Sequence, residues 1–165
     1  MIKKLRKIPK IKKNGHAGTL ETLATGILAI ALGEATKSIH YFNQNKVYVF
    51  NVVFGESRDT DDINGKIIKK SNIIPTLKEI NQCLIAFIGK HKQVPPKYSA
   101  VKVNGKRAYK LARNNQKFEI QPKDVFIKRL ECLGTKNRNE YSFTLECSSG
   151  TYVRSIARDL GKMLG

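Results

Sequence analysis

The sequence is poor in acidic residues and contains no long hydrophobic run. Of its 165 residues only 13 are Asp or Glu, against 31 Lys or Arg, and the formal net charge is +18. Such a charge favours polyanionic partners, which are nucleic acids or anionic membrane surfaces. No apolar run approaches the ~20 residues that span a bilayer, so we expect nucleic acid rather than a membrane. A codon bias would explain the preference for Lys over Arg, but not the scarcity of acids.

Cysteine and histidine are few, and they lie far apart along the chain. There are three of each: Cys83, Cys132, Cys147, His16, His40 and His91. The absence of paired spacings argues against a zinc site, a metal cluster and a disulfide framework. Free thiols are typical of the reducing cytoplasm. We therefore predict a cytoplasmic protein without a metal.

Hydrophobic periodicity predicts a mixture of strands and helices. We expect strands over 27–32 (buried, in preference to a helical turn), 47–54, 124–133 and 141–148. We expect helices over 34–42, 77–89 and 148–164, a short basic helix after a turn at 104–105, and an amphipathic segment over 1–13. Because strands and helices do not alternate regularly, the pattern predicts an α+β fold. Its central sheet would be mixed, mainly antiparallel and flanked by helices, in one domain with one core.

An acidic cluster interrupts the basic chain. Asp59, Asp61 and Asp62 precede an Asn-Gly turn at 64–65. These carboxylates could hold Mg²⁺ or Ca²⁺, but their spacing is not that of a calcium loop, and the closing Glu is missing. We favour a turn whose acids accept backbone hydrogen bonds and pair with surrounding lysines.

Three side chains are candidates for chemistry. Glu21 is the single carboxylate in the loop GHAGTLETLATG, whose small residues leave room for a ligand, although a lone acid is commonly structural. Arg154 lies in the first turn of a predicted helix, where the helix dipole disfavours a cation. We therefore expect it to have an anionic partner, in either a structural or a functional pair. Tyr48 is either half-buried core or a surface on which a base stacks.

Several basic segments could bind phosphate groups, although charged runs are commonly just solvated faces. They are the N-terminal run, Lys37, and the group Lys97, Lys102, Lys106, Arg107 and Lys110.

Four ordered motifs resemble those of the bacterial tRNA pseudouridine synthase B family. The first, GHAGTLETLATGILAIALGEATK, is similar to the pattern GH-T/A-G-x-LDPLATG followed by GEATK. The others read VYVFNVVFGESRDTDDINGKI, VPPKYSAVKVNGKRAYKLAR and ECSSGTYVRSIARDLGKMLG. Together they cover almost the whole chain from Gly15 to Gly165.

The resemblance implies an isomerase that converts a uridine in the T-arm of tRNA to pseudouridine, without cofactor or metal. The target base is flipped out of the RNA stack. Glu21 matches the position of the family's nucleophilic Asp, Arg154 matches the Arg that pairs with that carboxylate, and Tyr48 matches the Tyr that stacks on uracil. His16 lies in the loop that replaces the flipped base, Lys37 matches a contact to the RNA backbone, and Lys102 belongs to the basic stretch expected to bind RNA.

The chain also departs from the family pattern. Glu21 stands where the family has Asp, Thr22 where it has Pro, and Arg58 where Thr is usual. A carboxylate displaced by about 1 Å can cost ~10²-fold in rate, so we predict weak or no activity. The alternative is a non-catalytic tRNA-binding protein or RNA chaperone.

The resemblance also implies a single catalytic domain over residues 1–165, which we expect to be monomeric. By this comparison it lacks the family's first strand and KPxG turn, its C-terminal strands and its RNA-binding domain. Met1 would then fall inside the helix that leads to the Gly-His loop.

Overall fold

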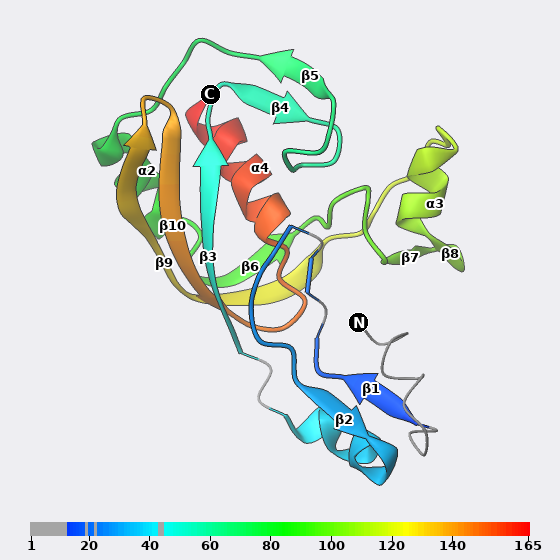
Figure 1. Cartoon of the computed structure of the whole chain (residues 1–165). Helices are drawn as coiled ribbons and strands as arrows, with labels where there is room; N and C mark the ends of the chain where they lie inside the picture. The colour runs from blue at the N-terminus through cyan, green and yellow to red at the C-terminus, as the bar shows by residue number, and fades with distance from the viewer. Residues whose placement is uncertain (1–12, 19, 22, 43–44) are drawn as a thin grey trace. The chain divides into compact units, whose positions relative to one another are not determined.

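The computed structural model describes residues 13–18, 20–21, 23–42 and 45–165. It divides into two units, residues 1–45 and 46–165, which we call unit 1 and unit 2 (Figure 1). The amphipathic segment and the helix expected at the start of the chain lie outside the described residues, apart from Lys13.

Unit 2 is built on a four-stranded antiparallel sheet in the order β3-β10-β9-β6. The strands are β3 (Lys46–Val53), β10 (Glu140–Cys147), β9 (Lys123–Asn137) and β6 (Gly89–Gln93). In β10, Phe143 faces Phe50 of β3 on one side and Cys132 of β9 on the other. The strands expected over 47–54, 124–133 and 141–148 are confirmed, although β9 is longer than predicted and β6 was not predicted.

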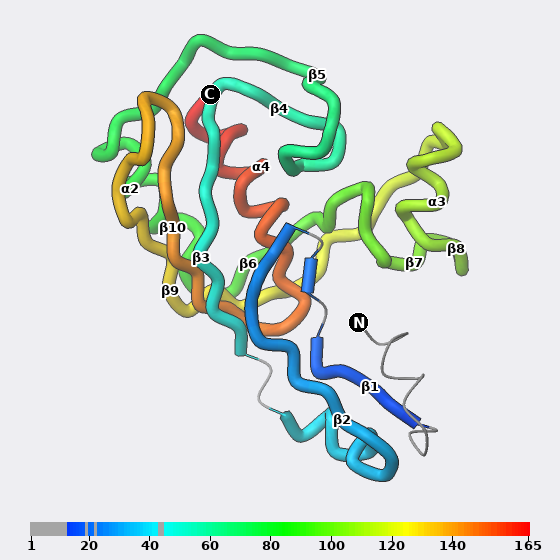
Figure 2. Tube along the Cα trace, viewed as in Figure 1, coloured from blue at the N-terminus to red at the C-terminus, as the bar shows by residue number. Residues whose placement is uncertain are grey.

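Helices α2 (Leu77–Ile85) and α4 (Val153–Leu164) supply the other half of the core. Ile80 and Leu84 of α2, with Ile156 and Leu160 of α4, join the apolar face of the sheet in one buried cluster. Figure 2 shows α4 running beside β3, with which it is in contact. The predicted apolar face of α4 is confirmed, although the helix begins at Val153 rather than at 148. The α+β fold is also confirmed, because helices and sheet meet across a single core.

Helix α2 begins at a capping box and ends earlier than predicted. The Thr76 hydroxyl accepts a hydrogen bond from the backbone N–H of Glu79, whose carboxylate accepts one from the backbone N–H of Thr76. The helix ends at Ile85 rather than Gly89. Gly89 instead opens β6 with a φ of 92°, a backbone conformation that glycine adopts without strain.

Two small hairpins complete unit 2. The first joins β4 (Glu56–Arg58) to β5 (Ile67–Lys70). The second joins β7 (Lys102–Val103) to β8 (Lys106–Arg107) and continues into helix α3 (Ala108–Arg113). The predicted turn at Asn104 and Gly105 is confirmed, with positive φ angles of 48° and 78°, as in a tight hairpin turn.

Unit 1 contains a short hairpin and a helix. Strand β1 (Asn14–His16) pairs with β2 (Ile30–Leu32), and the 3₁₀ helix η1 (Gly33–Tyr41) follows. The helix predicted over 34–42 is therefore of the tighter 3₁₀ type. The buried strand predicted over 27–32 is wrong in two respects: the strand begins only at Ile30, and Ile27 is fully exposed.

Candidate functional site

The acidic residues lie in a loop between β4 and β5, which we call the acid loop (residues 59–65). Asp59 Oδ1 accepts a hydrogen bond of 2.8 Å from the backbone N–H of Lys66. Asp62 Oδ1 accepts hydrogen bonds from the backbone N–H of Asn64 at 3.0 Å and from the hydroxyl of Thr60 at 2.7 Å. The prediction that these acids accept backbone hydrogen bonds is confirmed for Asp59 and Asp62.

Arg58 and Gly65 close the acid loop from within. Arg58 Nη1 donates to the carbonyl oxygens of Ile63 and Gly65, at 3.2 and 2.9 Å, so one guanidinium ties the far side of the loop to β4. A Cβ on Gly65 would lie only 2.3 Å from Thr60 Oγ1. The position therefore requires glycine, and the loop is packed tightly enough to keep a defined shape.

Arg154 joins the acid loop to helix α4. Its Nη1 donates to the carbonyl oxygens of Thr60 at 3.1 Å and Tyr98 at 3.3 Å, and Asp62 Oδ2 lies 3.6 Å from the same nitrogen. Only 16% of the Arg154 side chain is exposed. A guanidinium in this setting can hold an anion at a fixed position, because the backbone carbonyls already fix its orientation.

Arg158 lies one turn further along α4 and contacts three segments. It donates from Nη1 to Asp61 Oδ2 at 3.0 Å, from Nη2 to the carbonyl oxygen of Val94 at 2.8 Å, and from Nε to Asp159 at 3.0 Å. The partners of Asp61 and Asp62 are thus arginines of α4, not the lysines expected from the sequence. Burial raises the pKa of the Asp61 carboxyl above its ordinary value, although the charge of Arg158 opposes this.

The start of α4 is held from β6 by a buried amide. Gln93, the last residue of β6, is 1% exposed. Its Oε1 accepts from the backbone N–H of Tyr152 at 2.7 Å, and its Nε2 donates to the carbonyl oxygen of Tyr152 at 3.2 Å. The Ser155 hydroxyl adds a bond of 2.8 Å to the carbonyl oxygen of Val94. These hydrogen bonds fix the backbone at the start of α4, where Arg154 lies.

Tyr48 lies in β3, opposite Leu145 of β10. It is half-buried and packs against the core, as does Val153, the neighbour of Arg154 in α4. Tyr48 and Arg154 thus belong to elements that share one core. The interpretation of Tyr48 as partly buried core is confirmed, whereas its stacking role stays a prediction.

The remaining predicted catalytic residue lies in unit 1. Glu21 is exposed, and its carbonyl oxygen accepts a hydrogen bond of 3.1 Å from the backbone N–H of Ala24. Because Glu21 belongs to unit 1 and Arg154 to unit 2, the pair expected between their side chains stays a prediction. His16 in β1 donates from Nδ1 to the carbonyl oxygen of Gly18, and Lys37 in η1 pairs with Glu34 at 2.5 Å.

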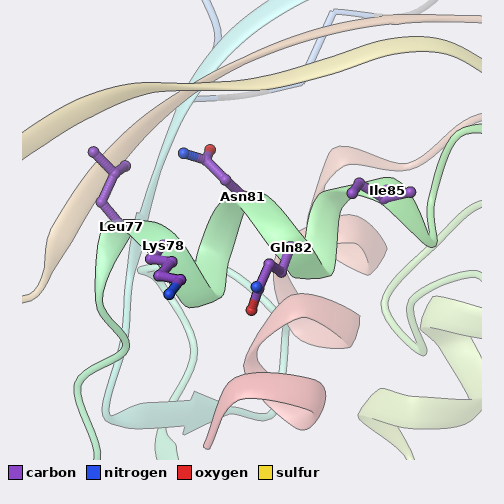
Figure 3. A pocket seen from close by; sticks show the side chains of 5 residues that line it. All are labelled: Leu77, Lys78, Asn81, Gln82 and Ile85. Atoms are coloured by element: carbon purple, nitrogen blue, oxygen red, sulfur yellow. The ribbon is translucent and has the colours of Figure 1, made fainter.

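The surface of unit 2 includes two hollows that border α2 and α3. One, of about 360 Å³, lies where the β7–β8 turn meets α3, and basic side chains supply much of its lining: Gly105, Lys106, Arg107, Lys110, Leu111, Asn114 and Gln116. Lys102 is exposed in the same hairpin. The other, of about 490 Å³, lies on α2 (Figure 3) and is lined by Leu77, Lys78, Asn81, Gln82 and Ile85. The first can attract phosphate groups, whereas the second contains no predicted site residue.

Within the described ranges, no group of three or more His, Cys, Asp or Glu side chains could hold a metal ion. The three cysteines are free thiols. No helix among the same residues is long and apolar enough to cross a membrane.

Sequence reasoning missed Arg158 and Gln93. One signal was available for Arg158, since two arginines four residues apart lie on the same face of a helix, and the acid loop was already identified. For Gln93 the sequence carried no signal, because its partner is the backbone of a residue 59 positions away.

The sequence matches one protein family over most of its length. The family model described as "TruB family pseudouridylate synthase (N terminal domain)" matches residues 6–153. The chain is 52% identical to a tRNA pseudouridine synthase B of Ehrlichia ruminantium, over 100% of this chain and 56% of that protein. It is 47% identical to one of Rhizobium etli, over 99% and 53%. The chain therefore spans about half the length of the curated relatives it matches.

Solved structures share the fold. A Cbf5–Nop10–Gar1 complex matches with a TM-score of 0.69 and 25% identity, over 99% of this chain and 40% of that chain. An H/ACA RNP bound to a substrate RNA containing 2'-deoxyuridine matches with a TM-score of 0.64 and 21% identity, over 99% and 38%.

Proposed function

The chain belongs to the TruB family of pseudouridylate synthases, and we propose that it isomerises a uridine in the T-arm of tRNA, weakly because Glu21 replaces Asp. The observation that carries this proposal is the setting of Arg154. Its side chain is 16% exposed, and its guanidinium donates to two backbone carbonyls beside Asp62, from a helix that is anchored in the core. The curated relatives that match the full length of the chain are named tRNA pseudouridine synthase B.

The proposed reaction breaks the N1–C1′ bond of uridine and forms a C5–C1′ bond. The Glu21 carboxylate attacks C1′ and displaces uracil through N1, and Arg154 stabilises the charge of the carboxylate and of the reacting nucleotide. Uracil turns, C5 displaces the carboxylate from C1′, and the hydrogen on C5 leaves as a proton while N1 gains one. Tyr48 would hold the flipped base by stacking. The reaction is an isomerisation and requires no oxidant or reductant.

Basic side chains would bind the RNA backbone. The net charge of +18 favours a phosphate partner, and the basic hollow beside α3 supplies Lys106, Arg107 and Lys110. We assign Lys102, Lys37 and His16 to RNA binding. The H/ACA RNP that shares this fold is bound to a substrate RNA, which supports an RNA partner here. The protein that we propose is monomeric and cytoplasmic. Light scattering of the purified chain tests its oligomeric state.

Tritium release from tRNA that carries 5-[³H]uridine tests the proposed reaction, because the C5 hydrogen is lost. We expect slow release by the chain and roughly 10²-fold faster release by Glu21→Asp, since that change restores the shorter acid. Glu21→Gln should abolish release. Glu119→Asp, at an exposed acid of unit 2, is the matched control and should change nothing.

The high positive charge and the longer acid at position 21 favour one alternative, a tRNA-binding protein or RNA chaperone without catalysis. Filter binding of the same tRNA separates the two functions. Tight binding with no release from either the chain or Glu21→Asp would contradict the isomerase and support the alternative.

A further inference from the structure

Two arginines of α4 contact the acid loop from the same side. Arg154 and Arg158 are four residues apart, and this spacing places them one above the other on a helix. Each joins the acid loop to the segment that follows β6: Arg154 through the carbonyls of Thr60 and Tyr98, and Arg158 through Asp61 and the carbonyl of Val94. The two guanidiniums thus form parallel links between the same parts of unit 2.

The link through Arg158 is the tighter of the two carboxylate contacts. Arg158 and Asp61 meet at 3.0 Å, with side-chain exposures of 19% and 14%, whereas Arg154 Nη1 and Asp62 Oδ2 are 3.6 Å apart. A distance of 3.6 Å exceeds that of a strong charge-assisted hydrogen bond, which is about 2.7–2.9 Å. The attraction between Arg154 and Asp62 alone therefore does not fix where Asp62 lies.

The position of Asp61 determines where its neighbours in the acid loop, Thr60 and Asp62, lie. Asp62 follows Asp61 directly, and Thr60 precedes it and donates to Asp62 Oδ1 at 2.7 Å. Arg58 and Gly65 keep the rest of the loop closed. Because these hydrogen bonds fix the residues of the loop relative to one another, a contact that holds Asp61 also places Thr60 and Asp62 against Arg154.

We infer that Arg158 and Asp61 are positioning residues: their ion pair holds the acid loop against α4, so that Thr60 and Asp62 orient the Arg154 guanidinium for the reaction. This inference rests on the proposed function. Neither residue is assigned a contact with the nucleotide. Their effect is on the orientation of Arg154, and it is measurable whether or not the chain turns over tRNA.

Arg158→Lys and Asp61→Asn test the inference in the full chain. Lys keeps the charge but loses the planar fork that reaches Asp61 and Val94 together, and Asn keeps the shape but loses the charge. The matched control is Arg129→Lys, because Arg129 pairs with Glu131 at the surface with 62% of its side chain exposed. The direct readout is the ¹⁵N side-chain signal of Arg154 in the free protein.

We expect the Arg154 signal to shift or broaden in Arg158→Lys and in Asp61→Asn, and to stay unchanged in Arg129→Lys. In steady-state tritium release, kcat should fall about 10- to 100-fold while KM for tRNA stays constant, as misorientation of a catalytic group predicts. An unchanged Arg154 signal in both variants would overturn the inference. So would a fall in kcat that comes with an equal loss of amide protection throughout unit 2, since that describes a merely structural pair.

The outcomes also separate this inference from the proposed function. If the chain and its Glu21→Asp variant release no tritium, the isomerase proposal fails, and the Arg154 signal alone decides whether Arg158 and Asp61 position that side chain. If tritium is released and the signal is insensitive to both substitutions, the isomerase stands and the positioning role falls.

Discussion

The two units differ in what maintains their shape. Unit 2 has a buried cluster to which β3, β9, β10, α2 and α4 all contribute. Among the described residues of unit 1 none is buried, and its hairpin consists of two three-residue strands. An isolated hairpin of two strands is marginally stable in water. Arg154 and Tyr48 are therefore held by a packed core, whereas Glu21, His16 and Lys37 belong to a unit whose described part is shaped by local hydrogen bonds and pairing.

A cavity in the core should produce the largest effect on stability. Leu160 is fully buried between α4 and the sheet, and Leu160→Ala should lower the free energy of unfolding by about 2–5 kcal/mol. Urea denaturation followed by circular dichroism measures the change. A loss below 1 kcal/mol would mean that the core of unit 2 does not carry the stability that its burial indicates, and the contrast with unit 1 would disappear.

Removal of the buried amide of Gln93 should have a smaller but still large effect. Gln93→Leu fills the space but leaves the N–H and C=O of Tyr152 without that partner, at a cost of about 1–3 kcal/mol. Hydrogen exchange should show reduced protection of backbone amides first at the start of α4. Gln82→Leu, at an exposed position of α2, is the control. Equal effects of the two substitutions would show that the Gln93 amide does not fix the helix start.

Loss of the N-cap of α2 should cost less again. Thr76→Ala should lower the free energy of unfolding by about 1 kcal/mol at neutral pH. The pKa of Glu79 is lowered by the hydrogen bond from the backbone of Thr76, so this carboxylate contributes stability above its ordinary pKa and loses it as pH falls through the lower, folded value. The Thr76 hydroxyl also donates to this carboxylate, so melting curves at neutral and acid pH should show the gap between wild type and variant narrowing in acid. A gap that is constant with pH would contradict a contribution from the hydroxyl–carboxylate bond.

The smallest effect is expected in unit 1. Ile27 is fully exposed, and Ile27→Ala should change the free energy of unfolding by no more than about 0.5 kcal/mol. The measurement is the urea titration used for Leu160→Ala. A loss as large as that of the core variant would show that Ile27 is buried in solution, and it would remove the distinction between the two units.

Local patterns predicted most of unit 2. Alternation over 141–148 identified β10, whose residues are alternately half-buried and buried, and the Asn104–Gly105 pair identified the β7–β8 turn. The apolar spacing from Val153 to Leu164 identified α4. In each case the feature depends on residues close in the sequence, so its signal is contained in a short window.

Features set by distant residues were missed or only partly predicted. The acid loop was expected to pair with surrounding lysines, but its partners are Arg154 and Arg158. Local patterns indicated an anionic partner for Arg154 and placed Arg158 on the same helix face, but they could not identify the acid loop as the partner. The apolar run at 27–32 has the composition of a buried strand, yet Ile27 is exposed. The prediction failed there because hydrophobicity alone does not specify what a segment packs against. Glu21 and Arg154 were linked through the family resemblance, not through a local signal.

The long sequence separation within the arginine cluster also bears on how the protein is made. Asp61 and Arg158 are 97 residues apart, so at roughly 5–20 residues per second a ribosome needs about 5–20 s to synthesise the chain between them. During that interval the acid loop has only its local contacts, those of Arg58 among them. Its contacts with Arg154 and Arg158 can form only after α4 has been synthesised, which makes the joining of the loop to α4 a late event in folding.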